Sequence, residues 1–319
     1  MRRLGTARAR ATPPPVDADG TPAPVFWSLA GTTASLVEEL AAALVARGVT
    51  IRTGTACQAV ERRPRKGSGP DRWTLTLGAP GSTAPQAGGS LDVDAVILAA
   101  PAPETAVLLA PHAPAAAGML SGIRYASVAV LTFALPEGSV GRPLRGTGFL
   151  VPRASTVGGR PALITGCTYL GRKWPHLARA GDELIRASVG RFGDERHTSM
   201  DDGQLVDAVL AELATLLGLD SPPLEARVTR WEGAFPQYEV GHLIRVTRIE
   251  EDLAALPALA VAGAALRGVG IPACIGSGRA AARTVRASLA GPSPSGPAPP
   301  SDPAGPPDPA GTTGTRPGP

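Results

Sequence analysis

The stretch LAVAGAALRGVGIPACIGSGRAAARTV, residues 259–285, places an apolar strand, a glycine-bearing turn and the start of a helix in succession. Glycines remove the side chains that would block a ligand, so backbone N–H groups and the helix dipole can reach an anion or a polar cofactor edge. The stretch therefore indicates a binding edge made of main chain. A tight turn with a helix cap explains the same residues equally well.

The embedded GVGIPA, residues 268–273, resembles a GxGxxA fingerprint. As a dinucleotide motif it is weak, because it starts several residues past the strand. Too little folded chain also follows for a βαβ unit and its ribose-binding acid. The motif by itself does not identify a ligand.

Patterns for nucleophilic or metal chemistry are missing from the sequence, which contains no GxSxG, HxxxH or CxxC. The cysteines Cys57, Cys167 and Cys274 are far apart and odd in number, so neither a disulfide framework nor a metal site is predicted. A reducing cytoplasm is the expected compartment. No catalytic residue is assigned, and the chemistry is expected to come from a cofactor.

Composition excludes other classes of partner. The 319 residues carry a formal charge of +4, and their arginines are scattered, so no nucleic-acid partner is expected. The longest apolar stretch, about 256–266, is too short to span a bilayer, which leaves only peripheral membrane contact open. The 43% hydrophobic content can fill a sizeable core.

The order of expected elements indicates a mixed α/β fold with one parallel and one more antiparallel part. A capping box, Ser35 with Glu38, opens the first helix, and Gly218 ends the second. The expected helices are 35–47, 202–217, a short one from PQYEVGH to about 256, and 272–289. The expected strands are 49–52, 57–62, 73–77, 93–99, 125–135, 148–151, 162–169, 226–231 and 259–263.

Four strings resemble the porphyrinogen oxidases, protoporphyrinogen oxidase and coproporphyrinogen III oxidase, of the flavin amine oxidase superfamily. They are ASLVEELAAALVARG (34–48), LDVDAVILAAPA (91–102), WEGAFPQYEVGH (231–242) and the stretch from residue 259. PQYxxGH together with GVGIPxCIxSG separates this family from amine oxidases and phytoene desaturases. The resemblance covers about residues 25–289.

The resemblance implies a partial FAD/NAD(P)-binding fold of the flavin amine oxidase type with an inserted substrate domain. Residues 25–105 and 229–290 correspond to parts of the FAD domain, and 106–228 to the substrate domain. The flanking segments 1–24 and 291–319 are rich in proline and glycine, and little order is expected in them.

The resemblance also implies cofactor-binding positions for FAD: Cys57, Trp231, Gly263, Val269, Gly270 and Ile271. Cys57 takes the place of a family valine whose backbone meets the adenine ring, and Trp231 matches a tryptophan near the flavin. Gly263 falls where the closing strand reaches the phosphates and ribityl chain. The last three match the turn against the flavin ring.

The reaction implied by the resemblance is flavin-mediated oxidation of a porphyrinogen to the porphyrin, with oxygen as acceptor, in haem biosynthesis. Coproporphyrinogen III is the expected substrate for a Gram-positive source, and protoporphyrinogen IX otherwise. The tetrapyrrole pocket would be mostly apolar, with basic groups for the propionates. A downstream haem-pathway enzyme is a further partner hypothesis.

One departure from the family is large. Members open with a strand, GxGxxG and a helix that hold the ADP half of FAD, whereas this sequence contains no GxGxxG. An open apolar sheet edge and weak FAD binding are therefore expected. A truncated gene product, a misplaced start and one half of a split enzyme all remain open. So does an inactive fragment that binds porphyrin or a partner chain, while PQYEVGH and GVGIPACIGSG argue against an oxidase of amines or carotenoids.

Overall fold

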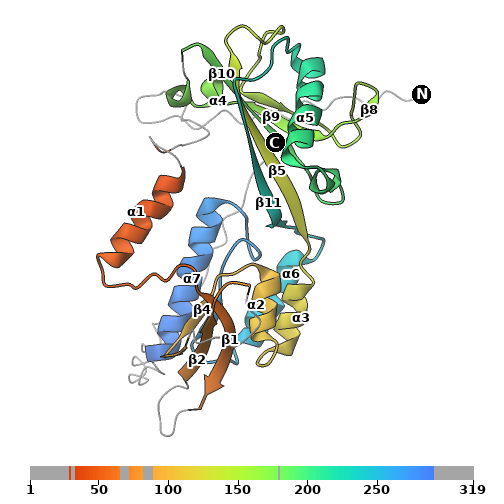
Figure 1. Ribbon diagram of the computed structural model, residues 1–319. Coiled ribbons are helices and arrows are strands. Elements are labelled where there is room, and N and C mark those ends of the chain that lie inside the picture. The colour runs from red at the N-terminus through yellow and green to blue at the C-terminus, as the bar shows by residue number, and fades with distance from the viewer. Residues whose placement is uncertain (1–28, 30–32, 65–71, 82–88, 179, 291–319) are drawn as a thin grey trace, which may run out of the picture.

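The structure is a computed structural model that describes residues 29, 33–64, 72–81, 89–178 and 180–290. The expected mixed α/β class is confirmed, because helices and strands of both parallel and antiparallel sheets build the molecule (Figure 1). The segments 1–24 and 291–319, for which little order was expected, lie outside the described residues.

The lower part of the molecule combines a three-stranded antiparallel sheet with a two-stranded parallel sheet (Figure 1). The antiparallel strands are β1 (Ala56–Arg63), β2 (Arg72–Gly78) and β3 (Ser90–Val93), and the parallel strands are β4 (Val96–Leu98) and β12 (Leu259–Val261). The helices are α2 (Ala102–Leu109), α3 (Pro114–Ser121), α6 (His242–Leu253) and α7 (Ile271–Ala290).

One hydrophobic core holds most of this lower part together. Trp73, Leu109 and Ile249 come from β2, α2 and α6, and all three side chains are fully buried in it. The Trp73 indole N–H donates to the Pro257 carbonyl at 3.0 Å. This bond satisfies a buried polar group and fixes β2 against the segment that leads into β12.

The upper part is a five-stranded antiparallel sheet with a second core. Its order is β11 (Glu225–Pro236), β5 (Tyr125–Pro136), β10 (Asp182–Val189), β9 (Ile164–Tyr169) and β6 (Gly148–Leu150). Helix α5 (Asp202–Leu217) packs on it through fully buried Leu205, Val209 and Leu213. The small elements are β7 (Thr156–Val157), β8 (Arg160–Pro161), α4 (Leu170–Lys173), η1 (Pro175–Leu177) and η2 (Arg196–Ser199).

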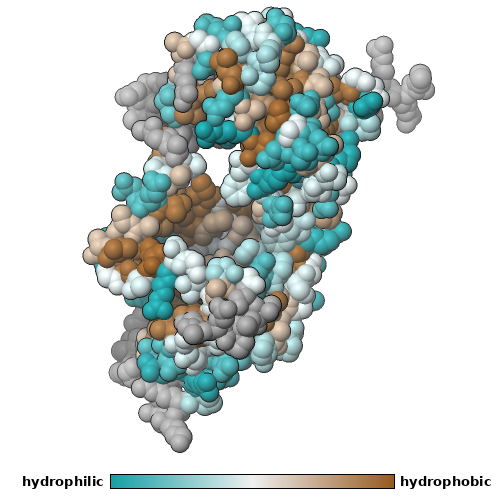
Figure 2. Space-filling model, viewed as in Figure 1, coloured by the Kyte–Doolittle hydropathy of each residue, from teal (hydrophilic) through white to brown (hydrophobic). Residues whose placement is uncertain are grey.

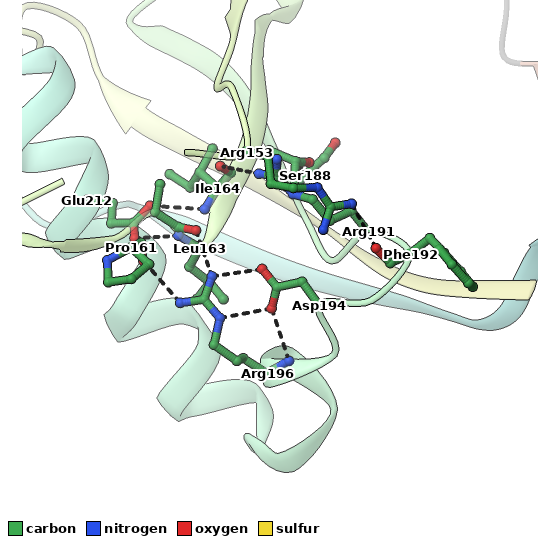
Figure 3. Close-up of polar contacts among 12 residues, drawn as sticks. Arg153, Pro161, Leu163, Ile164, Ser188, Arg191, Phe192, Asp194, Arg196 and Glu212 are labelled. Carbon is green, nitrogen blue, oxygen red and sulfur yellow. Dashed lines mark hydrogen bonds and ion pairs between the residues drawn. The ribbon is translucent and has the colours of Figure 1, made fainter. Parts of the chain in front are cut away.

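Polar contacts join α5 and the η2 region to the start of β9 (Figure 3). The Glu212 carboxylate of α5 accepts the N–H groups of Leu163 at 2.7 Å and Ile164 at 3.0 Å. The Arg196 guanidinium donates to the Pro161 carbonyl and pairs with Asp194. That pairing lowers the pKa of the Asp194 carboxyl to about 2, so both members of the pair are charged at neutral pH.

Three local expectations need correction. The structure forms no strand at 49–52, where Val49 and Ile51 are exposed and no neighbouring strand is present among the described residues. The first helix, α1 (Thr33–Val45), already begins before Ser35, so that residue lies inside its first turn. The apolar run 93–99 is divided, because β3 ends at Val93 and β4 begins at Val96 with a different partner.

The long strands β5 and β11 run from the upper sheet down to the helices of the lower part (Figure 1). They pair antiparallel from Glu225 opposite Ala134 to Pro236 opposite Tyr125. The two parts are therefore joined by this strand pair, whose register shifts between Trp231 and Phe235. Helix α1 has no buried residue, and its apolar side chains Leu36 and Leu40 are exposed.

Within the described residues, the parallel sheet consists of β4 and β12 alone. Ala258 and Ala262 of the β12 segment bond to β4, so Leu259 and Val261 direct their backbone groups to the other side. No strand pairs with that side in the part of the chain that the structure describes. It faces a mostly apolar cavity of about 700 Å³, walled by α6 and by the small side chains on one face of α7.

Candidate functional site

The carboxyl ends of β4 and β12 meet beside the N-terminus of α7. Gly263 follows β12 and lies close to the end of β4, since a Cβ added to it would be 3.8 Å from the Ala99 carbonyl oxygen. In open α/β sheets, ligands bind outside the carboxyl ends of the strands. This edge is therefore the first place to look for a binding site.

Gly263 begins a loop that runs to Gly270, which we call the glycine loop. Gly263 has a φ of +125°, a conformation that residues with a Cβ rarely adopt. Its N–H donates to the Ser277 hydroxyl of α7 at 3.1 Å. The loop is thus tied at its start to the second turn of the helix that it leads into. The sequence had not singled out Ser277.

Gly268 brings the glycine loop against the same helix. Its φ is +154°, and a Cβ at this position would lie 2.6 Å from the Ala273 Cβ. Such a distance is a clash between two atoms that cannot rotate away. Only glycine lets the loop pass this close to α7.

The residues after Gly268 combine an apolar surface with the main-chain N–H groups of Ile271 and Ala273, whereas Pro272 has no N–H and that of Cys274 donates to the Gly270 carbonyl. Val269 is 49% exposed, Ile271 is 50% exposed and Ile275, one turn further on, is 51% exposed. The first N–H groups of a helix have no acceptor within it. This part of the site can therefore hold a flat apolar ring and donate to its polar edge. The structure places Gly263, Val269, Gly270 and Ile271 in this single segment.

Tyr238, between β11 and α6, and His242, the first residue of α6, reach the glycine loop. The Tyr238 hydroxyl donates to the Ala264 carbonyl, and the His242 Nε2 contacts the Leu266 carbonyl at 2.7 Å. The sequence analysis used PQYEVGH only as a family marker. No local signal in the sequence indicated these contacts.

Trp231 lies on β11 where the pairing with β5 becomes irregular. The register shifts between Trp231 and Phe235, and both side chains are exposed, by 52% and 44%. A bulge of this kind turns side chains away from the regular ladder. No hydrogen bond or ring contact given for the described residues joins Trp231 to the glycine loop, so its place near a cofactor stays a prediction.

Cys57 lies on β1, beside a break in the register with β2. Its Sγ donates to the Ala59 carbonyl at 3.4 Å, and burial raises the pKa of the thiol. A protonated thiol is a poor nucleophile, so Cys57 is not suited to covalent chemistry. The described contacts do not connect it with the glycine loop, and its backbone contact with an adenine ring remains a prediction.

The described residues form neither a metal site nor a membrane span. No group of three or more His, Cys, Asp or Glu side chains is arranged to hold a metal ion there. No helix within that part of the chain is long and apolar enough to cross a membrane.

The chain belongs to the family of flavin-containing amine oxidoreductases, whose model matches residues 17–286. Within it, the chain is 40% identical over 195 residues to the coproporphyrinogen III oxidase of Bacillus subtilis (strain 168), covering 61% of this chain and 40% of that protein. It is 32% identical over 267 residues to the protoporphyrinogen oxidase of Bos taurus, covering 81% and 51%. The expected resemblance to porphyrinogen oxidases is confirmed.

A solved structure also supports the similarity to porphyrinogen oxidases. A crystal structure from Exiguobacterium sp. 255-15, whose protein is assigned by name as a protoporphyrinogen oxidase, aligns with a TM-score of 0.66 at 30% identity. The alignment covers 81% of this chain and 51% of that one. The chain spans between 34% and 54% of the length of the curated relatives that it matches.

The family name implies a flavin, and the glycine loop fits such a group. Gly268 keeps the loop close to α7, and no side chain stands on Gly270 in front of the first turn. Val269 and Ile271 expose an apolar surface beside main-chain donors, which suits an isoalloxazine ring with its flat apolar faces and its polar pyrimidinedione edge. These residues would hold the ring and orient it.

Proposed function

We propose that this chain carries the substrate domain and part of the cofactor domain of an FAD-dependent porphyrinogen oxidase of haem biosynthesis. The reaction would oxidise a porphyrinogen to the porphyrin, with molecular oxygen as the final acceptor. The observation that supports it best is a series of seven relatives named coproporphyrinogen III oxidase, at 31% to 40% identity. Those names favour coproporphyrinogen III over protoporphyrinogen IX as the substrate.

The chemistry of hydride removal would be supplied by the bound flavin. The residues of this chain would bind and orient. Main-chain N–H groups at the start of α7 would donate to the polar edge of the ring, and Val269 and Ile271 would exclude water from its apolar face. Gly263 would let the backbone approach the ribityl chain and phosphates. No side chain of the chain is assigned as a catalytic acid or base.

The tetrapyrrole would occupy the space between the two parts of the molecule. Figure 2 shows a hollow there whose wall is largely hydrophobic. Such a wall suits the uncharged ring system of a tetrapyrrole. Trp231 and Phe235 are exposed aromatic side chains on β11, which descends along this region. Contact with such rings would hold the pyrrole rings of the substrate and, after oxidation, would stack on the flat porphyrin product.

The test is a cofactor and activity measurement on the full chain. The visible spectrum of the purified protein reports bound flavin, and added coproporphyrinogen III is followed by porphyrin fluorescence and peroxide release. The same assays are then repeated with a GxGxxG unit from a related oxidase joined before Met1. Yellow protein that yields porphyrin and peroxide, with or without the added unit, supports the proposal. Protein that stays colourless and inactive in both forms contradicts it.

A second candidate function is a non-catalytic chain that binds a porphyrin or a partner polypeptide. The unpaired backbone of Leu259 and Val261 and the cavity beside it favour this alternative, because such an edge can accept another strand. Porphyrin binding without flavin and without turnover would favour it over the oxidase. The cytoplasm remains the proposed compartment in either case.

A further inference from the structure

Two aromatic rings of the PQYEVGH segment form a stacked pair under the glycine loop. The Tyr238 and His242 ring centroids are 4.1 Å apart, and their planes differ by 13°. Gly241 between them has a φ of +86° and begins α6. This left-handed residue turns the chain into the helix and leaves both rings on the same side.

Each ring makes a hydrogen bond to the glycine loop. The Tyr238 hydroxyl donates to the Ala264 carbonyl. His242 Nε2 lies 2.7 Å from the Leu266 carbonyl and must donate to it, since a carbonyl cannot donate. The pair therefore contacts the loop at two of its residues.

The one hydrogen bond of the His242 ring among the described residues goes to the glycine loop. The side chain is 95% buried, and its Nδ1 has no hydrogen-bond partner among the described residues. A buried ring nitrogen without a partner is unfavourable by itself. The polar contact that offsets this cost is the bond from Nε2 to the loop.

The stacked pair completes a set of ties along the loop. Ser277 holds Gly263 at one end, and Arg267 pairs with Glu250 of α6. Tyr238 and His242 fix the carbonyls between these two points. Ala265 and Leu266 in the middle of the loop are also buried, so the two hydrogen bonds add polar ties to a segment that packing holds just before Val269.

We propose that Tyr238 and His242 are positioning residues that hold the glycine loop in the conformation which presents Val269, Gly270 and Ile271 to the cofactor. The role in cofactor placement rests on the function proposed above. The hold on the loop does not, because both hydrogen bonds form within the chain itself. The two parts of the inference can therefore be tested separately.

The first measurement is amide hydrogen exchange on the full chain without cofactor. Tyr238→Phe removes one hydroxyl and keeps the stacked ring, and His242→Leu removes the other donor at similar volume. We expect exchange over residues 264–274 to rise about five-fold in each variant, the factor given by losing one hydrogen bond of ordinary net strength. Unchanged exchange in both variants would overturn the proposal.

The matched control is Tyr125→Phe. It also removes a phenol hydroxyl bonded to backbone, but that hydroxyl accepts the Ala102 N–H at the start of α2. We expect faster exchange near Ala102 and an unchanged exchange rate in the glycine loop. A rise in the loop with this control as large as with Tyr238→Phe would mean general loosening and would also overturn the proposal.

The second measurement is FAD binding, followed by flavin fluorescence and the visible spectrum, in the form of the protein that binds flavin. We expect Tyr238→Phe to leave the thermal midpoint unchanged. It should raise the FAD dissociation constant at least three-fold and shift the flavin absorption bands. A faster-exchanging loop with wild-type affinity and spectrum would refute the positioning role. If no wild-type form binds FAD, the proposed function fails, while hydrogen exchange still decides whether the pair holds the loop.

Discussion

At the scale of single residues, the glycine loop depends on two positions without a side chain. Gly263 and Gly268 adopt φ values of +125° and +154°. The glycine motif can be recognised in the sequence, but the sequence does not show why glycine is required at these positions. The clash that a Cβ at Gly268 would make with Ala273 exists only because the loop folds back on the helix that follows it.

Gly268→Ala should therefore destabilise the protein by about 2–4 kcal/mol, the sum of backbone strain and a clash that the helix cannot relieve. Urea unfolding measures this difference. Gly159→Ala is the control, because Gly159 also has a positive φ, +78°, but has open space around it. It should cost about 1 kcal/mol from strain alone. Equal losses in the two variants would show that the contact with Ala273 carries no energy.

Tyr238 and His242 show how a short string can mark a family without revealing its purpose. The spacing in PQYEVGH is visible in the sequence, but the acceptors of its two side chains lie 26 and 24 residues further along. Hydrogen-bond partners at that distance are decided by the path of the chain. Local patterns contain no information about them.

At the scale of elements, the best predictions were those with signals at both ends. The helix expected at 202–217 is observed with these bounds as α5. Asp201 and Gln204 form a capping box, and Gly218 ends the helix with a φ of +70°. Caps depend on neighbours within a few residues, so tertiary contacts did not override them.

Helix α5 should lose stability when its link to β9 is removed. In Glu212→Ala the N–H groups of Leu163 and Ile164 lose their charged acceptor, and we expect a loss of about 2–3 kcal/mol in the free energy of unfolding. Asp207→Ala, an exposed acidic residue on the same helix, is the control and should change stability by less than about 0.5 kcal/mol. Denaturant titration compares the two, and similar effects would argue against the link.

Short elements were missed. The sequence analysis did not predict α2 and α3, which have proline near their N-termini but are only eight residues long, so their periodicity is weak. They form because Leu109 and Leu120 are buried in the lower core. Strand β10 was also missed, although it lies between β5 and β9 and pairs with both.

At the scale of the whole molecule, the two large cores lie toward opposite ends of the β5–β11 strand pair, and the upper core includes buried side chains of β5. Leu109 belongs to the lower core and Leu213 to the upper one, and both are fully buried. The domain limits proposed from the sequence, with 106–228 as the substrate domain, stay a prediction. The upper core is drawn from residues 129–217, whereas α2 and α3 belong to the lower core.

The two cores should respond separately to mutation. Leu213→Ala and Leu109→Ala each remove a buried leucine, at a cost of about 2–5 kcal/mol. In calorimetry we expect each variant to shift a different part of the unfolding transition, because the cores share few side chains. The two variants serve as each other's control. If both shift one common transition equally, the molecule unfolds as a single unit.

The sequence alone determined the family, the mixed α/β class, the capped helix and the position of the glycine loop, because these depend on residue types within short windows. Only the tertiary structure decided where 93–99 divides between two sheets, that 49–52 has no partner strand, and that PQYEVGH contacts the glycine loop. The physical reason is the same in each case. Strand pairing and side-chain contacts between distant segments depend on how the whole chain packs, which no local pattern of hydrophobic and polar residues specifies.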